Sequence, residues 1–164
     1  NVADVLSLVP AAIARAVTRS VEMKARIVER DETETGERML LNLGHTFGHA
    51  LEAFTGYSSR LLHGEGVAIG TVLAFRMSEA LGLCRPQSAA RVAAHLKAVG
   101  LPTTVADIPG DKPDAATFVR LMGQDKKVAD GKLTFIVARA IGDTLVTRDV
   151  GAAYVEGFLR EAMA

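Results

Sequence analysis

The sequence has one cysteine, no net charge and no long apolar run. Cys84 cannot form an intrachain disulfide, which is typical of a reducing compartment, and we expect it to be a small buried side chain. The 19 basic and 19 acidic residues balance, so the chain has no overall field to attract nucleic acid or an anionic membrane. Apolar stretches are too short for a transmembrane helix, and Asp4 and Arg15 interrupt any signal-peptide pattern. These absences predict a cytoplasmic protein without nucleic-acid or membrane partners.

The 164 residues are ordinary in composition and predict a single, mainly helical domain over 1–164. Apolar periodicity and capping residues predict helices at about 11–29, 38–52, 64–81, 87–98, 114–121 and 151–162. Residues 132–138 and 144–147 are rich in Thr, Ile, Val and Phe, with Gly142 and Asp143 between them. This pattern predicts a small β-hairpin near residues 132–148.

Three of the four histidines lie between residues 38 and 65. If residues 38–52 form one helix, each residue turns roughly 100° about its axis. Arg38, Asn42, His45 and His49 would then share one polar stripe, opposite an apolar face. Such a stripe predicts a surface that binds a metal ion or an anionic substrate.

His45 and His49 stand four residues apart, which lets two imidazoles on one helix face share a metal. The same spacing also fits two hydrogen-bonded histidines in a helix interface. Gly44 and Gly48 favour a functional surface, because each costs about 1 kcal/mol relative to alanine inside a helix. Two such glycines predict that another backbone or a ligand packs closely here.

His63 begins the third predicted helix, where the electropositive end favours a neutral, metal-competent imidazole. Glu65 could cap this helix or orient a metal ligand. We expect His95, which has no neighbouring histidine, to lie on a helix surface.

Lys24 shares a helix face with Val17, Val21 and Val28, which places its charge toward the core or a cleft. It either extends to solvent or binds an anion, and we favour the anion. Lys126 and Lys127 fit a solvated turn, although two adjacent ammonium groups can also hold a phosphate.

Taken together, these motifs resemble 3-dehydroquinate synthase. The resemblance rests on the string LNLGHTFGHALE with Arg38 ahead of it, on HGE at 63–65, on the segments 22–24 and 31–34, and on Asp125-Lys-Lys. Order and spacing agree from about residue 10 to residue 150. The resemblance implies a multihelical C-terminal domain of the dehydroquinate synthase-like fold.

Enzymes of this family convert 3-deoxy-D-arabino-heptulosonate 7-phosphate to 3-dehydroquinate and phosphate, in the shikimate route to aromatic amino acids. The resemblance implies NAD, bound mainly by an N-terminal domain, together with Zn²⁺ or Co²⁺. A glycine-rich nucleotide loop after a strand is lacking here, so we expect that domain to be absent from this chain and the chain alone to be inactive. Apolar faces left by the missing domain lead us to expect a homo-oligomer.

By this resemblance, His45 and His63 are the metal ligands, and His49 assists proton transfer near the phosphate. The family's third ligand is a glutamate upstream of the residues present here. Because a catalytic zinc site normally has three protein ligands, we expect this chain alone to bind little metal.

The resemblance also assigns residues to the substrate. Lys24 and Arg38 suit the carboxylate, with Arg38 able to bind it bidentately. Asn42, His49 and one of Lys126 and Lys127 suit the phosphate. The catalytic set implied by the family is His49, Lys24 and Glu34.

Three alternatives compete with this interpretation. Another sugar phosphate cyclase of the same superfamily would act on a substrate without a carboxylate, and the presence of both Lys24 and Arg38 argues against it. A metal-dependent polyol dehydrogenase would have no phosphate to bind. A non-catalytic helical binding domain could have kept the motif without the activity.

Overall fold

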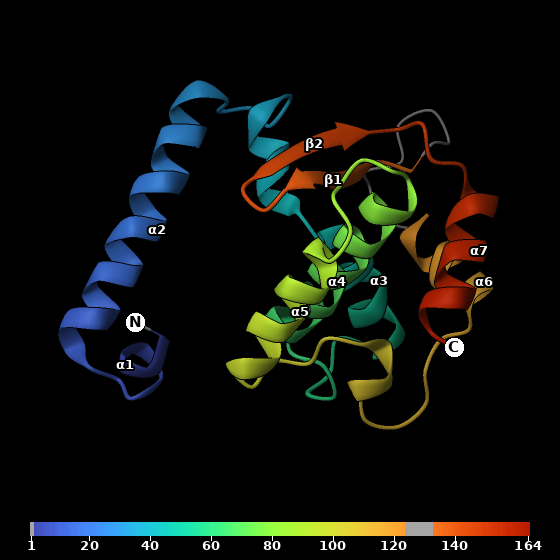
Figure 1. Cartoon of the computed structure of the whole chain (residues 1–164), viewed down its shortest axis with the longest axis horizontal. Helices are drawn as coiled ribbons and strands as arrows, with labels where there is room; N and C mark the ends of the chain where they lie inside the picture. Colours follow the sequence, from blue (N-terminus) through green and yellow to red (C-terminus); the bar gives the residue numbers. More distant parts are fainter. Residues whose placement is uncertain (1, 124–132) are drawn as a thin grey trace. The chain divides into compact units, whose positions relative to one another are not determined.

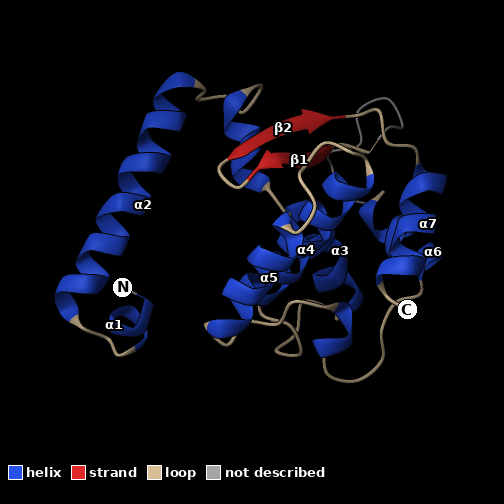
Figure 2. Cartoon of the chain, viewed as in Figure 1, coloured by secondary structure: helices blue, strands red, loops and turns tan. Residues whose placement is uncertain are grey.

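The computed structural model describes residues 2–123 and 133–164, and these residues divide into two compact units. Unit 1 spans Asn1–Leu41 and unit 2 spans Asn42–Ala164. Lys126 and Lys127, two of the predicted phosphate-binding residues, lie outside the described residues. Figure 1 shows the chain coloured along its sequence, and Figure 2 shows it by secondary structure.

Unit 1 consists of a short helix, α1 (Val2–Leu6), a long helix, α2 (Pro10–Arg30), and most of a 3-10 helix, η1 (Glu37–Asn42). The fixed φ of Pro10 suits the first turn of α2. The predicted helix at 11–29 is therefore confirmed, whereas α1 is not among the predicted elements.

The prediction that Lys24 points toward a core or a cleft is wrong for the chain as described. Lys24 is exposed, and Val17 and Val21 on its helix face are 57% and 60% exposed. Ala12 is the one residue of α2 that is buried. The physical reason is that α1 and η1 are too short to cover an apolar face 21 residues long.

Unit 2 is mainly helical, with a two-stranded antiparallel hairpin (Figure 2). Its elements in chain order are α3 (His45–Phe54), α4 (His63–Ala80), α5 (Ser88–Ala98), η2 (Val105–Asp107), α6 (Ala115–Met122), β1 (Phe135–Ala140), β2 (Asp143–Thr147) and α7 (Ala152–Ala162). Each helix predicted from residue 64 onward is confirmed, as is the hairpin. The 3-10 helix η2 is not among the predicted elements.

Aromatic side chains from distant parts of the sequence join the elements of unit 2. The ring of Phe47 on α3 lies 5.6 Å from Phe135 of β1, 6.3 Å from Phe118 of α6 and 6.5 Å from Phe158 of α7, measured between centroids. Phe47 is 1% exposed. Burying such side chains stabilises the unit by about 2–3 kcal/mol each, which fixes α3 firmly in the core.

Close backbone contact between α3 and α4 confirms the prediction made from Gly44 and Gly48. A Cβ atom on Gly48 would lie 3.0 Å from the backbone of Gly66 in α4. A Cβ on Gly44 would lie 2.5 Å from the backbone nitrogen of Thr71. Glycine at these positions lets the two helices approach until their backbones touch.

The single helix expected over residues 38–52 is wrong. The 3-10 helix η1 ends at Asn42, and α3 begins only at His45. Gly44 lies between them in the left-handed region, with φ 82°. This break means that Arg38, Asn42, His45 and His49 do not share one α-helical stripe.

The hairpin is anchored to the core by a hydroxyl group. Ser78 of α4 is fully buried, and its Oγ donates to the carbonyl oxygen of Ala74 at 2.6 Å. The same Oγ accepts the backbone N–H of Ala138 in β1 at 2.8 Å. Since Ala138 is also fully buried, no water can replace this bond.

The Ser78→Ala variant is expected to lower the free energy of unfolding of unit 2 by about 2 kcal/mol, because the buried N–H of Ala138 loses its acceptor. Urea denaturation followed by circular dichroism measures this change. Ser59→Ala, at an exposed loop position of the same unit, should change it by less than about 0.5 kcal/mol. Equal effects of the two substitutions would contradict the role given to Ser78.

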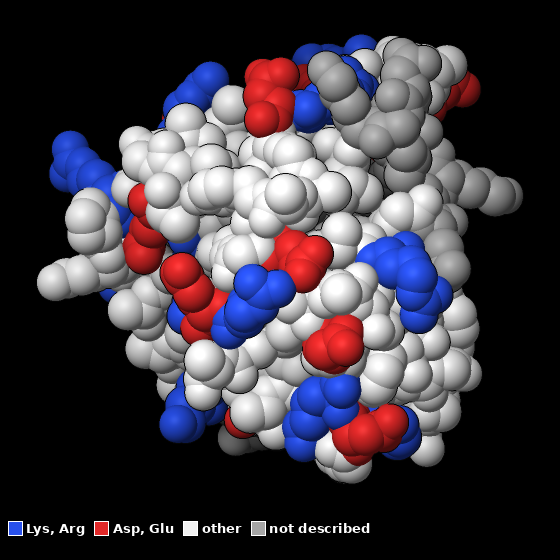
Figure 3. Space-filling view, turned by 90° about the vertical axis from the view of Figure 1, so that its right-hand side faces the viewer, with Lys and Arg blue, Asp and Glu red and all other residues white. Residues whose placement is uncertain are grey.

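Among the described residues, every helix is either too short or too polar to cross a membrane. The face of the molecule in Figure 3 carries basic and acidic side chains scattered among uncharged ones, in keeping with the balanced composition.

Candidate functional site

Three histidines of unit 2 form one group, which we call the histidine cluster: His45, His49 and His63. The ring centroids of His45 and His49 are 5.4 Å apart, and those of His45 and His63 are 5.5 Å apart. His49 and His63 are separated by 6.0 Å. The structure thus brings together the two predicted metal ligands and the predicted proton-transfer residue.

The local backbone explains this grouping. His45 is the first residue of α3 and His49 follows one turn later, so both lie on the same side of the helix. His63 is the first residue of α4. Three residues later in the same helix, the backbone of Gly66 packs against Gly48 of α3. The glycine contact therefore holds the first turn of α4, with His63, beside α3.

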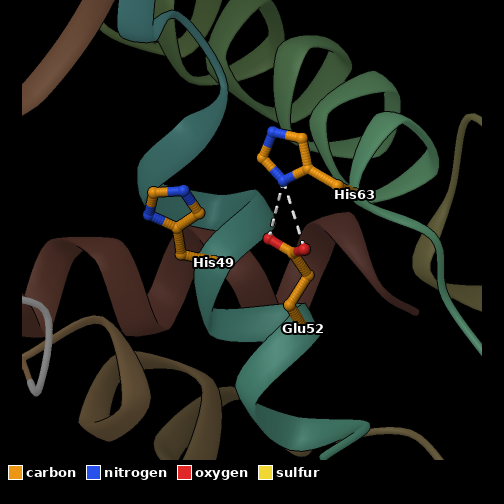
Figure 4. A group of neighbouring side chains, drawn as sticks. All are labelled: His49, Glu52 and His63. Carbon is orange, nitrogen blue, oxygen red and sulfur yellow. Dashed lines mark hydrogen bonds and ion pairs between the residues drawn. The ribbon is translucent and has the colours of Figure 1, made fainter. Parts of the chain in front are cut away.

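Glu52 is a fourth member of this site that the sequence interpretation did not include. It lies three residues after His49 on α3 and is 9% exposed. Both of its carboxylate oxygens lie 3.1 Å from Nδ1 of His63, as Figure 4 shows. A carboxylate can only accept hydrogen bonds, so Nδ1 of His63 carries the hydrogen.

His45 is oriented in a similar way by the backbone. Its Nδ1 lies 3.3 Å from the carbonyl oxygen of Leu43. A carbonyl oxygen also only accepts, so this nitrogen is the donor. In both His45 and His63, the neutral ring therefore has its lone pair on Nε2, the nitrogen that can bind a metal ion.

His49, Glu52 and His63 also satisfy a simple geometric requirement for a metal site. Each offers one ligand atom, and these atoms lie within 4.8 Å of one another. The signal in the sequence was the i, i+3 spacing of His49 and Glu52, which places both on one helix face.

Glu65 caps α4. Its Oε2 accepts the backbone N–H of Leu62 at 2.8 Å, just before the helix begins. Of the two roles open from the sequence, the structure supports the cap. His95 is exposed on α5, as expected.

In unit 1, Asp31 organises the loop between α2 and η1. Its carboxylate accepts the backbone N–H groups of Arg38 at 2.9 Å, Thr35 at 3.0 Å and Gly36 at 2.8 Å. These bonds lower the pKa of Asp31 below its ordinary value because they stabilise the charged carboxylate, and the bond from the N–H of Arg38 has the largest effect.

The titration of Asp31 is expected to have a midpoint below the ordinary aspartate pKa of about 3.9. Because the folded pKa is lowered, its contribution to stability is complete above the ordinary value and is lost as the pH falls through the lower, folded value. Carbon NMR of the carboxyl group measures this midpoint, and the amide signals of Thr35, Gly36 and Arg38 should move with it. Those amide shifts should vanish in Asp31→Asn, and a midpoint at the ordinary value would contradict the bonding.

This loop places two other predicted site residues side by side. Nη1 of Arg38 donates to the carbonyl oxygen of Glu32 at 2.6 Å, and Nε of Arg38 lies 3.9 Å from Oε2 of Glu34. Glu34 has a left-handed backbone, with φ 57°, which is uncommon for a residue with a side chain. Asn42 is half-buried at the end of η1.

Comparison with solved structures shows which fold this chain has. The chain matches 2-epi-5-epi-valiolone synthase from Streptomyces hygroscopicus, solved with NAD⁺ and Zn²⁺ bound, with a TM-score of 0.76 and 22% identity, over 98% of this chain and 44% of that one. It also matches 2-deoxy-scyllo-inosose synthase, solved with carbaglucose-6-phosphate, NAD⁺ and Co²⁺, with a TM-score of 0.64 and 22% identity, over 79% of this chain and 36% of that one. The fold is therefore that of the sugar phosphate cyclases.

Sequence comparison gives the family. The model of the 3-dehydroquinate synthase C-terminal domain matches residues 1–128. The 3-dehydroquinate synthase of Roseobacter denitrificans is 65% identical over 148 residues, which cover 90% of this chain and 40% of that protein. That of Cereibacter sphaeroides is 61% identical over 155 residues, covering 94% and 42%. The chain belongs to the 3-dehydroquinate synthase family, and it spans about 40% of the length of these relatives.

Proposed function

We propose that this chain supplies the metal-binding and substrate-binding part of a 3-dehydroquinate synthase. The reaction is the conversion of 3-deoxy-D-arabino-heptulosonate 7-phosphate to 3-dehydroquinate and phosphate. Family membership supports the reaction, and the relatives' greater length supports an NAD-binding domain outside this chain. The chain alone is expected to be inactive.

The orientation of two imidazoles carries the proposal for the metal. Nδ1 of His45 faces the carbonyl oxygen of Leu43, and Nδ1 of His63 faces the carboxylate of Glu52. Metal-binding histidines usually donate their second nitrogen to such acceptors. The donor set fits Zn²⁺ or Co²⁺ bound through Nε2 of His45 and Nε2 of His63, with a third ligand from outside this chain.

When bound, NAD⁺ would supply transient oxidation of the substrate, and a metal ion held by His45 and His63 would supply polarisation of the oxygens around the reacting carbon. His49 of this chain, beside both proposed metal ligands, would then carry a proton near the departing phosphate. Asn42 and one of Lys126 and Lys127 would bind the phosphate.

Lys24 and Arg38 are the residues that the family resemblance assigns to the substrate's carboxylate. Arg38 can bind a carboxylate bidentately, and Lys24 offers a second positive charge. The close approach of Glu34 to Arg38, at 3.9 Å, supports a role for Glu34 in setting the direction of the guanidinium. Asp31, through its bond to the N–H of Arg38, holds this segment in place.

A direct test joins this chain to the N-terminal part of the Roseobacter denitrificans relative, giving a fused protein of full family length. With NAD⁺ and Zn²⁺, this fused protein should release phosphate from 3-deoxy-D-arabino-heptulosonate 7-phosphate, whereas the chain alone and the N-terminal part alone should not. A well-folded fusion that releases no phosphate would contradict the proposal and favour a non-catalytic binding domain.

The same fused protein separates the synthase from another sugar phosphate cyclase. A seven-carbon sugar phosphate that lacks the carboxylate should be a poor substrate, since Lys24 and Arg38 would have no anion to bind. Preference for that substrate would instead assign the chain to a cyclitol-forming enzyme.

A further inference from the structure

We propose that Glu52 is a positioning residue that holds His63 in the tautomer required for metal binding. This inference rests on the proposed metal site at His63. It starts from the bond in Figure 4, where both carboxylate oxygens of Glu52 lie 3.1 Å from Nδ1 of His63. With its hydrogen on Nδ1, the neutral imidazole leaves Nε2 as the nitrogen able to bind the ion.

The surroundings of Glu52 make it a fixed acceptor. The side chain is 11% exposed, and burying a carboxylate is unfavourable unless a donor satisfies it. Its stem lies under the first turn of α4, where a Cβ on Gly66 would stand 3.5 Å from Cγ of Glu52. That is an ordinary van der Waals distance, so the stem of Glu52 packs against this turn.

Exposure distinguishes this role from direct metal ligation. The side chain of His63 is 59% exposed, whereas that of Glu52 is buried beneath it. Figure 4 shows the second ring nitrogen of His63 on the side of the ring away from Glu52. A metal on Nε2 would therefore be bound on the open side of the ring, and Glu52 would act through the imidazole without touching the metal.

The tautomer of His63 gives a direct readout. In the chain labelled with ¹⁵N at histidine, at a pH at which imidazoles are neutral, Nδ1 of His63 should have the chemical shift of a protonated ring nitrogen and Nε2 that of an unprotonated one. In Glu52→Ala the acceptor is gone, and the hydrogen should move largely to Nε2. Glu65→Ala, which removes the cap of α4 but no acceptor of Nδ1, should leave the tautomer unchanged.

Zinc affinity of the fused protein gives the second readout. Loss of a partner that orients a metal ligand typically weakens binding about 10–100-fold. We expect this range for Glu52→Ala and a smaller loss for Glu52→Gln, whose amide oxygen can still accept the hydrogen from Nδ1. The visible absorption of the Co²⁺ form should keep its shape in Glu52→Gln, because the atoms bound to the metal do not change.

The outcomes separate this inference from the proposed function. If His63→Ala leaves zinc affinity unchanged, the proposed metal site is wrong. If His63→Ala weakens zinc binding but Glu52→Ala leaves the tautomer as it was, the metal site stands and the positioning role is overturned. If Glu52→Gln weakens zinc as much as His63→Ala and alters the Co²⁺ spectrum, Glu52 is itself a ligand and the inference is also overturned.

Discussion

Replacing His45 with alanine is expected to lower phosphate release by the fused protein about 1000-fold. A bound metal ion supplies several kcal/mol of charge stabilisation, and about 4 kcal/mol corresponds to a factor of about 10³ in rate. The shared orientation of His45 and His63, each with Nδ1 directed at an acceptor, is the basis for this expectation. Steady-state phosphate release at saturating NAD⁺ and Zn²⁺ measures it.

His95→Ala is the matched control, because it removes the one histidine outside the histidine cluster. His95 is exposed on α5, and its loss should leave turnover within about twofold of the parent, as for an ordinary surface substitution. If His45→Ala and His95→Ala have equally small effects, His45 is not a metal ligand.

Replacing Gly44 with alanine is expected to lower the free energy of unfolding by about 3 kcal/mol. Its left-handed backbone, with φ 82°, disfavours a side chain by about 1–2 kcal/mol. In addition, the new Cβ would lie 2.5 Å from the backbone nitrogen of Thr71 and 2.9 Å from the carbonyl carbon of Gly70, and such overpacking costs about 1–3 kcal/mol. Chemical denaturation measures the loss.

Gly82→Ala separates these two causes. Gly82 has a similar φ of 70°, but a Cβ there would meet nothing within 4 Å. Its substitution should therefore cost only the backbone part, about 1 kcal/mol. If the two variants lose the same stability, the close approach of α3 to α4 at Gly44 is not what this glycine provides.

The sequence predicted much of unit 2 because the signals there are local. Apolar periodicity and glycine stops define α4 and α5, and the segments on either side of Gly142 define the hairpin. The break at Gly44 could not be predicted in the same way. Gly44 predicts a close backbone approach, but its partners there, Gly70 and Thr71, are distant in sequence, and nothing local indicates its left-handed φ.

In the candidate site, too, the residues marked by local sequence signals were predicted, and the one that depends on a contact with another helix was not. His45, His49 and His63 were singled out by spacing and by the family resemblance, and they do lie together. Glu52 was missed because its partner, His63, is eleven residues away on the next helix. Around Lys24, the apolar periodicity correctly predicted the helix α2. It could not show that no other element of unit 1 covers the apolar face of this helix.

The most direct test of the proposed metal centre is the zinc content of the fused protein after dialysis, compared among His45→Ala, His49→Ala and His63→Ala. We predict about one zinc per chain in the parent and in His49→Ala, which should keep its metal but lose turnover. His45→Ala and His63→Ala should lose most of their zinc. Loss of zinc from His49→Ala, with full retention in His45→Ala, would contradict this assignment and place the ion among His49, Glu52 and His63.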